Sequence, residues 1–405
     1  MRSEEMNIIS DSIKIIKTEG LIQYCVRLIK RGQGNFYYLL MWVMMAISHQ
    51  SRFQLKDINE GQKKRTVNTI NSIENSISRI INSYNLAIKD QKIQQEVYKI
   101  SGDWAIIFGN DQQELIQKLK QGDREGVNAI LSNFARDKVS RGLHLFDTIP
   151  HSFFHKLLLL NCYNKSYFIW KKMTFLPDEV LEYSKEIGNM HGIDIDGKSI
   201  MLPSFNQSYF AQKIDRLFTG SLKKITILEI GGGYGSLPYH LFKHTSLKCR
   251  YIYVDLPEMC TLATYFLMNH FPDKKILLYK ESENQISDFS EYDIIILPNY
   301  CLPDLPERSV DLVFNSHSMT QMDPDTLKEY LRQINRICKK YFLHANNENE
   351  NNSLTPGLKY LNLNNPEYEL PKTEFKQIYR LPELIRNDGF LIPEYSSWEY
   401  LYERI

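Results

Sequence analysis

Paired cysteines are missing from this 405-residue sequence. A C-x-x-C pair is typical of zinc ribbons, and disulfide-rich domains need many cysteines, so both classes are excluded. We also find no Asp and His residues at metal-ligand spacing, and we expect no bound metal. Scattered cysteines are typical of a reducing compartment, so we expect a cytoplasmic protein. The six cysteines are Cys25, Cys162, Cys249, Cys260, Cys301 and Cys338.

A long hydrophobic run and a strong net charge are missing too. The most apolar run, FYYLLMWVMMAI at 36–47, would span about 18 Å as a helix, against roughly 30 Å for a bilayer core, which predicts a buried helix. The start, MRSEEMNIIS, has acids where a signal peptide has basic residues, so we expect no signal peptide. A net charge of +1 predicts no nucleic-acid partner, although residues 1–100 contain 15 Lys and Arg against 9 Asp and Glu.

Residues 1–200 predict a mostly α-helical region. Stretches such as INSIENSISRIINSYNLAI place Ile and Leu at steps of three and four residues. In a further predicted helix, Asp111 is the expected N-cap and Gly122 the expected stop. Residues 186–209 are rich in Gly, Asp, Asn and Pro and predict a connector or an ordered loop.

Residues 201–405 alternate apolar strands with helices. The predicted strands include ITILEI, CRYIYVDL, YDIIILPN, VDLVFNS and KYFLHAN. This alternation predicts an α/β fold whose open, mostly parallel sheet is covered on both faces. The tail at 380–405 is expected to add a helix and a last strand. We therefore expect two domains: 1–200 for acceptor recognition or oligomerisation as a homodimer, and 201–405 for cofactor binding.

Four glycines fall within five residues of ILEIGGGYGSLPYHL. A glycine turn between a strand and a helix lets a cofactor lie against bare backbone at the helix N-terminus. Dinucleotide sites place a third glycine where this chain has Ser236. Glu229 favours another cofactor, because a buried strand rarely ends in a carboxylate unless a cation needs it, and S-adenosylmethionine carries an ammonium and a sulfonium. The E-x-G-x-G-x-G spacing looks like the first motif of class I methyltransferases, at Glu229, Gly231, Gly233 and Gly235.

A second acid, Asp255, ends the next predicted strand, 24 residues after Gly231. A carboxylate there can accept both hydroxyls of a ribose, which either cofactor offers. Adenine is expected in an apolar slot lined by Asn299 or Tyr300 after the strand IIILPN, although KKILLYKE competes for that strand position. Tyr209, on the helix before the first strand, either closes over the cofactor or packs as an ordinary core residue.

The stretches ILEIGGGYGSLPYHL, YIYVDLPEM, DLVFNSHSMTQM and YFLHANN occur in this order. In these motifs the sequence resembles the sugar O-methyltransferase family, class I S-adenosylmethionine enzymes associated with polysaccharide and glycosylated natural-product gene clusters. The resemblance covers roughly residues 186–405 and implies a Rossmann-like fold, S-adenosylmethionine and a sugar-containing acceptor. Where the family often has Glu-Met, this chain has Gln321–Met322. A catalytic role of an acid at that step is therefore in doubt here.

Methyl transfer to a hydroxyl needs aligned reactants and a base that removes the hydroxyl proton. His317 is the first candidate base, because it follows the strand VDLVFNS at the sheet edge where α/β folds form their sites, and imidazole titrates near neutral pH. His344, at the end of the following strand, is the second candidate. Asn315, Ser318 and Asn346 are placed to orient the acceptor or the methionine moiety. For each histidine, simple packing is the alternative.

The leading hypothesis is an S-adenosylmethionine-dependent O-methyltransferase acting on a sugar in a nucleotide sugar, glycan or glycoside. Three alternatives stay open. The acceptor is instead a phenolic or polyketide hydroxyl, or the protein is an NAD-linked oxidoreductase. In the third, it is a non-catalytic module whose basic N-terminal helices contact an acidic membrane surface or a glycosyltransferase.

Overall fold

The computed structural model describes residues 51–63, 74–282, 289–348, 361, 363, 365–368, 370–385 and 397–405. The apolar run predicted as a helix at 36–47 lies outside them. In the described part of the N-terminal half, the amphipathic periodicity forms helices as expected. They are α4 (Leu55–Gly61), α5 (Glu74–Gln91), α6 (Gly102–Asn110), α7 (Gln113–Gln121), α8 (Arg124–Leu131) and α9 (Phe153–Thr174).

The ends of α7 correct one prediction and confirm another. Its N-cap is Gln112 and not Asp111, because α6 continues to Asn110 and Asp111 closes that helix as its C-cap. Gly122 ends α7 as expected, with a left-handed φ of 71° that glycine adopts without a steric penalty.

The residues predicted as a connector contain a small antiparallel sheet. Strands β2 (Ile193–Ile195) and β3 (Lys198–Ile200) form a hairpin, and β1 (Glu182–Tyr183) pairs with β3. The turn residues Asp196 and Gly197 both have positive φ, 50° and 86°, which is the type I′ geometry favoured by Asp-Gly. The connector prediction is wrong here, because the Asp and Gly of IDIDGKSI belong to a tight turn flanked by strand residues.

The predicted α/β fold is confirmed in residues 202–405. The sheet has the order β10-β11-β9-β8-β4-β5-β7-β6; all neighbours from β9 to β6 pair in parallel, and β11 is antiparallel to both β9 and β10. The strands are β4 (Ile225–Ile230), β5 (Cys249–Asp255), β6 (Ile276–Leu278), β7 (Ile294–Pro298), β8 (Val310–Ser316), β9 (Cys338–Asn347), β10 (Phe375–Pro382) and β11 (Ser397–Arg404). The helices are α10 (Leu202–Leu217), α11 (Ser236–His244), α12 (Pro257–His270) and α13 (Pro324–Ile337).

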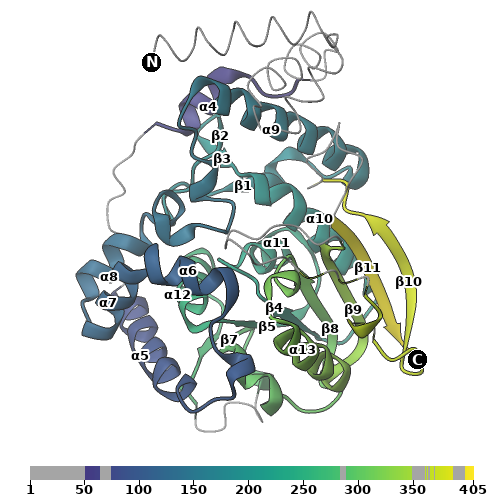
Figure 1. The fold of residues 1–405 in the computed structure, drawn as a ribbon. Helices are drawn as coiled ribbons and strands as arrows, with labels where there is room; N and C mark the ends of the chain where they lie inside the picture. Colours follow the sequence, from purple (N-terminus) through teal and green to yellow (C-terminus); the bar gives the residue numbers. More distant parts are fainter. Residues whose placement is uncertain are drawn as a thin grey trace, which may run out of the picture.

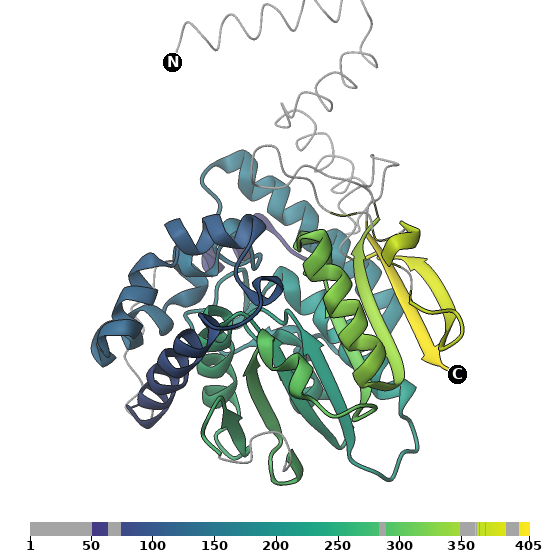
Figure 2. The same cartoon turned by 60° about the horizontal axis from the view of Figure 1, so that its bottom comes forward.

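Helices cover both faces of the sheet, as in a Rossmann-like fold. Helices α10, α11 and α12 pack on one face and α13 on the other, where Figure 2 shows it in front of the sheet. Helices α5, α7 and α8 lie beyond the β6 edge, and β10 and β11 form the opposite edge (Figure 1). One hydrophobic cluster includes residues from both halves of the chain, such as Phe134 and Tyr234. The expected domain boundary at 200 stays a prediction.

Two ambiguities of the sequence are resolved by strand pairing. Both stretches that competed for one strand position are strands: β7 pairs with β5, and β6 lies outside β7. Asn299 therefore follows the strand next to β5. The tail adds the expected last strand, with Tyr400 and Leu401 buried, but it also forms strand β10, which the sequence did not suggest. The expected tail helix is not formed in 380–385, because β10 runs to Pro382, and residues 386–396 lie outside the described residues.

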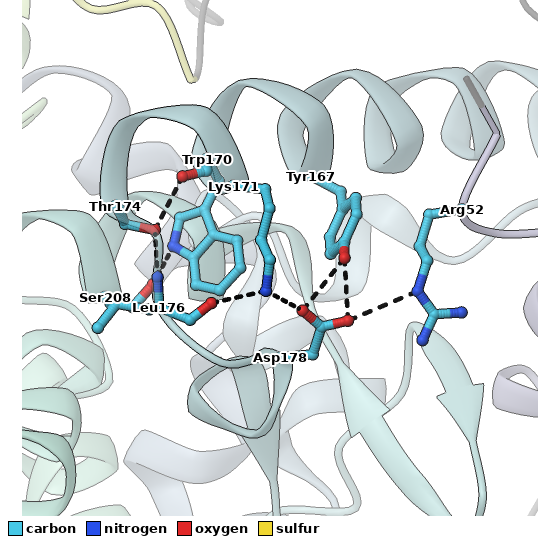
Figure 3. A network of polar contacts seen from close by, with 8 residues as sticks. All are labelled: Arg52, Tyr167, Trp170, Lys171, Thr174, Leu176, Asp178 and Ser208. Atoms are coloured by element: carbon cyan, nitrogen blue, oxygen red, sulfur yellow. Dashed lines mark hydrogen bonds and ion pairs between the residues drawn. The ribbon is translucent and has the colours of Figure 1, made fainter.

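A polar network fixes the C-terminal end of α9 (Figure 3). The indole nitrogen of Trp170 donates to Ser208 Oγ on α10 at 2.9 Å. Asp178 accepts hydrogen bonds from Lys171 and Tyr167 and lies 3.5 Å from Arg52 Nε. Burial alone would raise the pKa of Asp178, but the Lys171 and Tyr167 hydrogen bonds hold it below its usual value. The network joins α9 to the first helix of the α/β unit.

Candidate functional site

The glycine turn after β4 is fixed by conformation and by space. Gly231 has a φ of 72°, and a Cβ added there would lie 2.2 Å from Ser318 Oγ. Asn315 holds Ser318 in place, because its Nδ2 donates both to Ser318 Oγ (2.5 Å) and to the carbonyl oxygen of Ile230 (2.8 Å). Only glycine fits at position 231. The turn therefore leaves bare backbone at the N-terminus of α11, where a polar ligand can approach closely.

Asp255 at the end of β5 is tied to the same turn. Its Oδ2 accepts from the Gly233 amide at 3.1 Å and from the Tyr253 hydroxyl at 2.9 Å, and its Oδ1 accepts from the Leu256 amide at 2.7 Å. Burial raises the pKa of Asp255 to about 6, although these three hydrogen bonds oppose the rise. The carboxylate thus lies at the expected place beside the glycines and titrates just below neutral pH.

Glu229 lies beneath the turn. Its Oε2 accepts from the Tyr251 hydroxyl at 2.8 Å, and a Cβ added to Gly232 would lie 2.3 Å from that oxygen. Burial raises the pKa of Glu229 to about 8; the Tyr251 hydrogen bond opposes the rise and the charge of Asp255 adds to it. Glu229 does not line the adjoining cavity. Gly232 packs directly on this carboxylate, and a role of Glu229 in cofactor binding stays a prediction.

A cavity of about 60 Å³ opens beside Gly231 and Asp255. Asn299 lines it, and its Nδ2 donates to the Tyr98 carbonyl and to the Tyr330 hydroxyl, both at 2.9 Å. The Oδ1 atom of Asn299 is buried and has no hydrogen-bond partner. An unpaired buried acceptor is costly, and an exocyclic amine such as that of adenine would satisfy it. The cavity is also lined by Ile230, Val254, Leu256, Ser318, Gln321, Met322, Thr326 and Tyr330.

The other wall of this cavity comes from the N-terminal half. We call residues 96–104 the strap; its Val97, Lys99, Ser101 and Trp104 line the cavity. The strap is fastened at its two ends. The Tyr98 hydroxyl donates to Glu329 Oε1 at 2.6 Å, and the Trp104 indole donates to Gln321 Oε1 at 3.0 Å. A hydrogen bond from Arg332 lowers the pKa of Glu329 to about 2, so Tyr98 donates to a charged carboxylate.

His317 is paired with a carboxylate that the sequence did not suggest. Its Nε2 lies 2.7 Å from Glu383 Oε2. Glu383 is 2% exposed and also accepts from Asn206 Nδ2 at 2.7 Å and from the Ser397 hydroxyl. His317 has a φ of 60° directly after β8, and its amide donates to the Ala345 carbonyl. A non-glycine residue with positive φ is uncommon, and such strain clusters at functional sites.

His344 belongs to a buried polar chain that starts at the glycine turn. Asn315 Oδ1 accepts from Asn346 Nδ2 at 2.8 Å, and the same Nδ2 lies 3.4 Å from His344 Nδ1. Burial lowers the pKa of His344 to about 3, so the imidazole is neutral at physiological pH. Its ring stacks on Phe342 and Tyr400 and lines a different cavity on the α13 face. His344 is therefore not brought together with His317.

Two tyrosines proposed for the cofactor site do not line the cavity. The Tyr209 hydroxyl donates to Glu399 Oε2 at 2.9 Å, so Tyr209 packs between α10 and β11, which is the core-packing alternative given above. The Tyr300 hydroxyl donates to the Ala87 carbonyl at 2.9 Å, within the core. Of the two residues expected near adenine, Asn299 and Tyr300, Asn299 lines the cavity.

Neither Glu383 nor the strap had a sequence signal of its own. Glu383 lies in RLPEL, a stretch without a motif, and becomes significant only when β10 and β11 bring it to His317. Trp104 meets Gln321 across 217 residues. The replacement of an acid by Gln321 pointed to this position, and the structure gives the amide a hydrogen-bond partner there.

Among the described residues, no group of three or more His, Cys, Asp and Glu side chains is arranged to hold a metal ion. Within the same part of the chain, no helix is both long and apolar enough to span a bilayer.

Comparisons with known proteins find solved structures that resemble this chain at low sequence identity. No protein-family model and no curated protein matches the sequence. The chain is similar to a SAM dependent methyltransferase from Aquifex aeolicus, with 18% identity and a TM-score of 0.30 over 50% of this chain and 94% of that one. It is similar to the mitomycin 7-O-methyltransferase MmcR, with 14% identity and a TM-score of 0.33 over 50% of this chain and 55% of that one. It is also similar to magnesium protoporphyrin IX methyltransferase (ChlM) from Synechocystis PCC 6803 with bound SAM, with 10% identity and a TM-score of 0.31 over 50% of this chain and 82% of that one. Likenesses this distant leave the function to be argued from the site.

Proposed function

We propose that this protein is an S-adenosylmethionine-dependent O-methyltransferase that methylates a hydroxyl group of a sugar, in a nucleotide sugar, a glycan or a glycoside. The observation that carries the proposal is the His317–Glu383 pair, whose histidine directly precedes Ser318, the residue that packs against Gly231 of the glycine turn. A carboxylate-oriented imidazole is the group that removal of a hydroxyl proton requires.

Three features of the cavity fit S-adenosylmethionine. Gly231 lines the cavity and the turn brings backbone to the N-terminus of α11, which suits the methionine moiety. Asp255 offers a carboxylate for the ribose hydroxyls, and the unpaired Oδ1 of Asn299 offers an acceptor for the adenine amine. When bound, the cofactor supplies an electrophilic methyl group on a positively charged sulfonium.

The residues of this chain then remove the proton of the acceptor hydroxyl. Glu383 Oε2 lies 2.7 Å from His317 Nε2 and orients the imidazole, and Nδ1 is the atom that we assign as the base. An acceptor hydroxyl at Nδ1 gives up its proton as the oxygen attacks, and the resulting imidazolium is stabilised by the buried Glu383 carboxylate. Asn206 and Ser397 hold that carboxylate in place through hydrogen bonds to its two oxygens. A sugar hydroxyl is a weak acid, so it depends on such a base.

The N-terminal half belongs to this proposed site. Val97, Lys99 and Trp104 line the cofactor cavity, which favours a catalytic protein over a module whose N-terminal helices serve only for docking. The motif order described above supports a sugar acceptor.

The proposal is tested with the purified full chain, S-adenosylmethionine and a panel of nucleotide sugars, glycans and glycosides, analysed by mass spectrometry. We expect a product heavier than its acceptor by one methylene, roughly 14 Da, because one methyl replaces one hydroxyl proton. His317→Ala should bind S-adenosylhomocysteine as the wild type does but form no product, whereas the exposed His151→Ala serves as the matched control. Methylation of nitrogen only, or full activity of His317→Ala, would overturn the proposal.

A further inference from the structure

A second cavity lies on the α13 face of the sheet and is larger than the one beside the glycine turn. Its volume is about 300 Å³, within the range of pockets that hold small molecules. Strands β9, β10 and β11 form its floor at the light-green and yellow edge of the sheet in Figure 1. Leu363, Tyr368 and Leu370 form the opposite wall. The two cavities share no lining residue.

This cavity is also distinct from the proposed reaction centre. Glu383, the partner of His317, is held by Asn206 of α10, a helix that packs on the other face of the sheet. Phe210 of α10 contacts Phe314 there, whereas Phe342 and His344 point to the α13 side. A ligand in the larger cavity would therefore not occupy the position of the reacting hydroxyl.

The floor presents the edges of aromatic rings. His344 stacks on Tyr400 at an interplanar angle of 14°, and Phe342 stacks on Tyr402 at 20°. Tyr400 and Tyr402 are parallel within 6°. Because the ring faces are covered by one another, the floor offers imidazole and phenol edges to a ligand and no broad aromatic face. Such a floor suits a ligand that forms hydrogen bonds better than one that stacks.

The charges at the mouth cancel. Arg380 Nε lies 2.6 Å from Glu348 Oε1, and its Nη2 contacts the other oxygen of the same carboxylate. The Tyr400 hydroxyl donates to Glu348 as well. His344 is neutral, and its Nδ1 accepts from Asn346, whose Nδ2 also donates to Asn315 Oδ1; the ring therefore keeps Nε2 as a donor. Arg380 lines the cavity, and its ion pair with Glu348, which lies outside the lining, neutralises its charge.

We propose that this cavity is a second binding site, separate from the methyl-transfer site, for one neutral ring that carries several hydroxyl groups. A hydroxyl both donates and accepts, which matches the amide of Gln377 and the imidazole edge of His344. The apolar side chains of Met319, Leu331 and Leu363 suit the C–H faces of such a ring. The same chemistry comes from a glycosyl residue or from a free cyclitol.

The test is ligand-observed NMR titration of the full chain with methyl β-D-glucopyranoside and with myo-inositol, each with and without saturating S-adenosylhomocysteine. We expect saturable binding of at least one of the two, unaffected by S-adenosylhomocysteine. The probe that binds identifies the source, since one is a glycoside and the other a free cyclitol. 4-Nitrophenol is the flat aromatic control and should bind more weakly. Because methyl transfer is not measured, the result is independent of the proposed reaction.

Three variants locate the binding. Gln377→Leu removes an amide from the mouth of the cavity and should weaken binding about fivefold, the effect of one hydrogen bond. Leu331→Trp fills the cavity and should abolish binding. Lys376→Ala, at an exposed neighbouring position that does not line the cavity, should change nothing. Gln377 is exposed, so its replacement is informative even if Leu331→Trp fails to fold. Absence of saturable binding by both polyols, binding that Gln377→Leu leaves unchanged, or stronger binding of 4-nitrophenol would each overturn the proposal.

Discussion

The Nε2 atom of His317 lies 2.7 Å from Oε2 of Glu383, although 66 positions separate the two residues in the sequence. If Glu383 positions the base, Glu383→Gln should lower kcat by about 10- to 100-fold and leave the KM for S-adenosylmethionine unchanged, because the ring loses the carboxylate that stabilises its charged form. The acid limb of the pH profile of kcat should shift to lower pH, because an imidazole without a neighbouring carboxylate has a lower pKa and stays deprotonated further into the acid range.

Glu383→Asp is the companion variant, because it retains the charge at a shorter reach. It should recover part of the activity lost in Glu383→Gln. A purely structural role for Glu383 would instead lower the melting temperature and leave the pH profile unchanged.

Two glycine substitutions distinguish the effect of the close contact between Gly231 and Ser318 from the effect of backbone strain. Gly231→Ala should weaken S-adenosylhomocysteine binding at least tenfold, because the new Cβ would lie 2.2 Å from Ser318 Oγ and displace the turn. Gly220 is the matched control: its φ is 82°, yet a Cβ there would meet nothing within 4 Å. Gly220→Ala should cost only the roughly 1–2 kcal/mol of a left-handed non-glycine residue and leave binding intact. Equal binding by both variants would show that the turn does not contact the cofactor.

Asp255 predicts how cofactor binding depends on pH. Its pKa is raised to about 6 by burial, and only the carboxylate can accept both ribose hydroxyls. The affinity for S-adenosylhomocysteine should therefore be near its maximum at pH 7 and fall as the pH decreases through 6. The decrease in affinity should approach tenfold per pH unit, as expected when one group takes up one proton. Calorimetric titration between pH 5 and 7.5 measures this. The Asp255→Asn variant should bind S-adenosylhomocysteine weakly at every pH and lose the pH dependence near 6. Glu229, whose pKa is about 8, titrates at a higher pH and does not account for that dependence.

The strap leads to a kinetic prediction. The cavity beside it holds about 60 Å³, far below the roughly 300 Å³ of small ligand pockets, so we expect the strap to move when the cofactor enters. Trp104→Phe removes the indole donor to Gln321 and should increase the rate of S-adenosylhomocysteine dissociation about fivefold. Hydrogen exchange of residues 96–104 should slow on binding in the wild type. Tyr167→Phe, which loses a hydrogen bond to Asp178 far from this cavity, should leave that rate unchanged.

The parts that the sequence predicts well are those set by neighbouring residues. Strand β4, the glycine turn and Asp255 follow from an apolar run, residues without a Cβ and a carboxylate at a strand end. Glu383 and Trp104 could not be placed this way, because each meets its partner only through the order of strands in the sheet or through a segment from the other half of the chain. Tyr209 shows the reverse case: its position before β4 was foreseen, but its hydroxyl is taken by Glu399.

The most direct test of the central claim is a calorimetric titration of the full chain with S-adenosylhomocysteine and, separately, with NADH. One S-adenosylhomocysteine per chain should bind, with the affinity lost in Gly231→Ala, and NADH should give no saturable heat. Binding of NADH with no binding of S-adenosylhomocysteine would contradict the account.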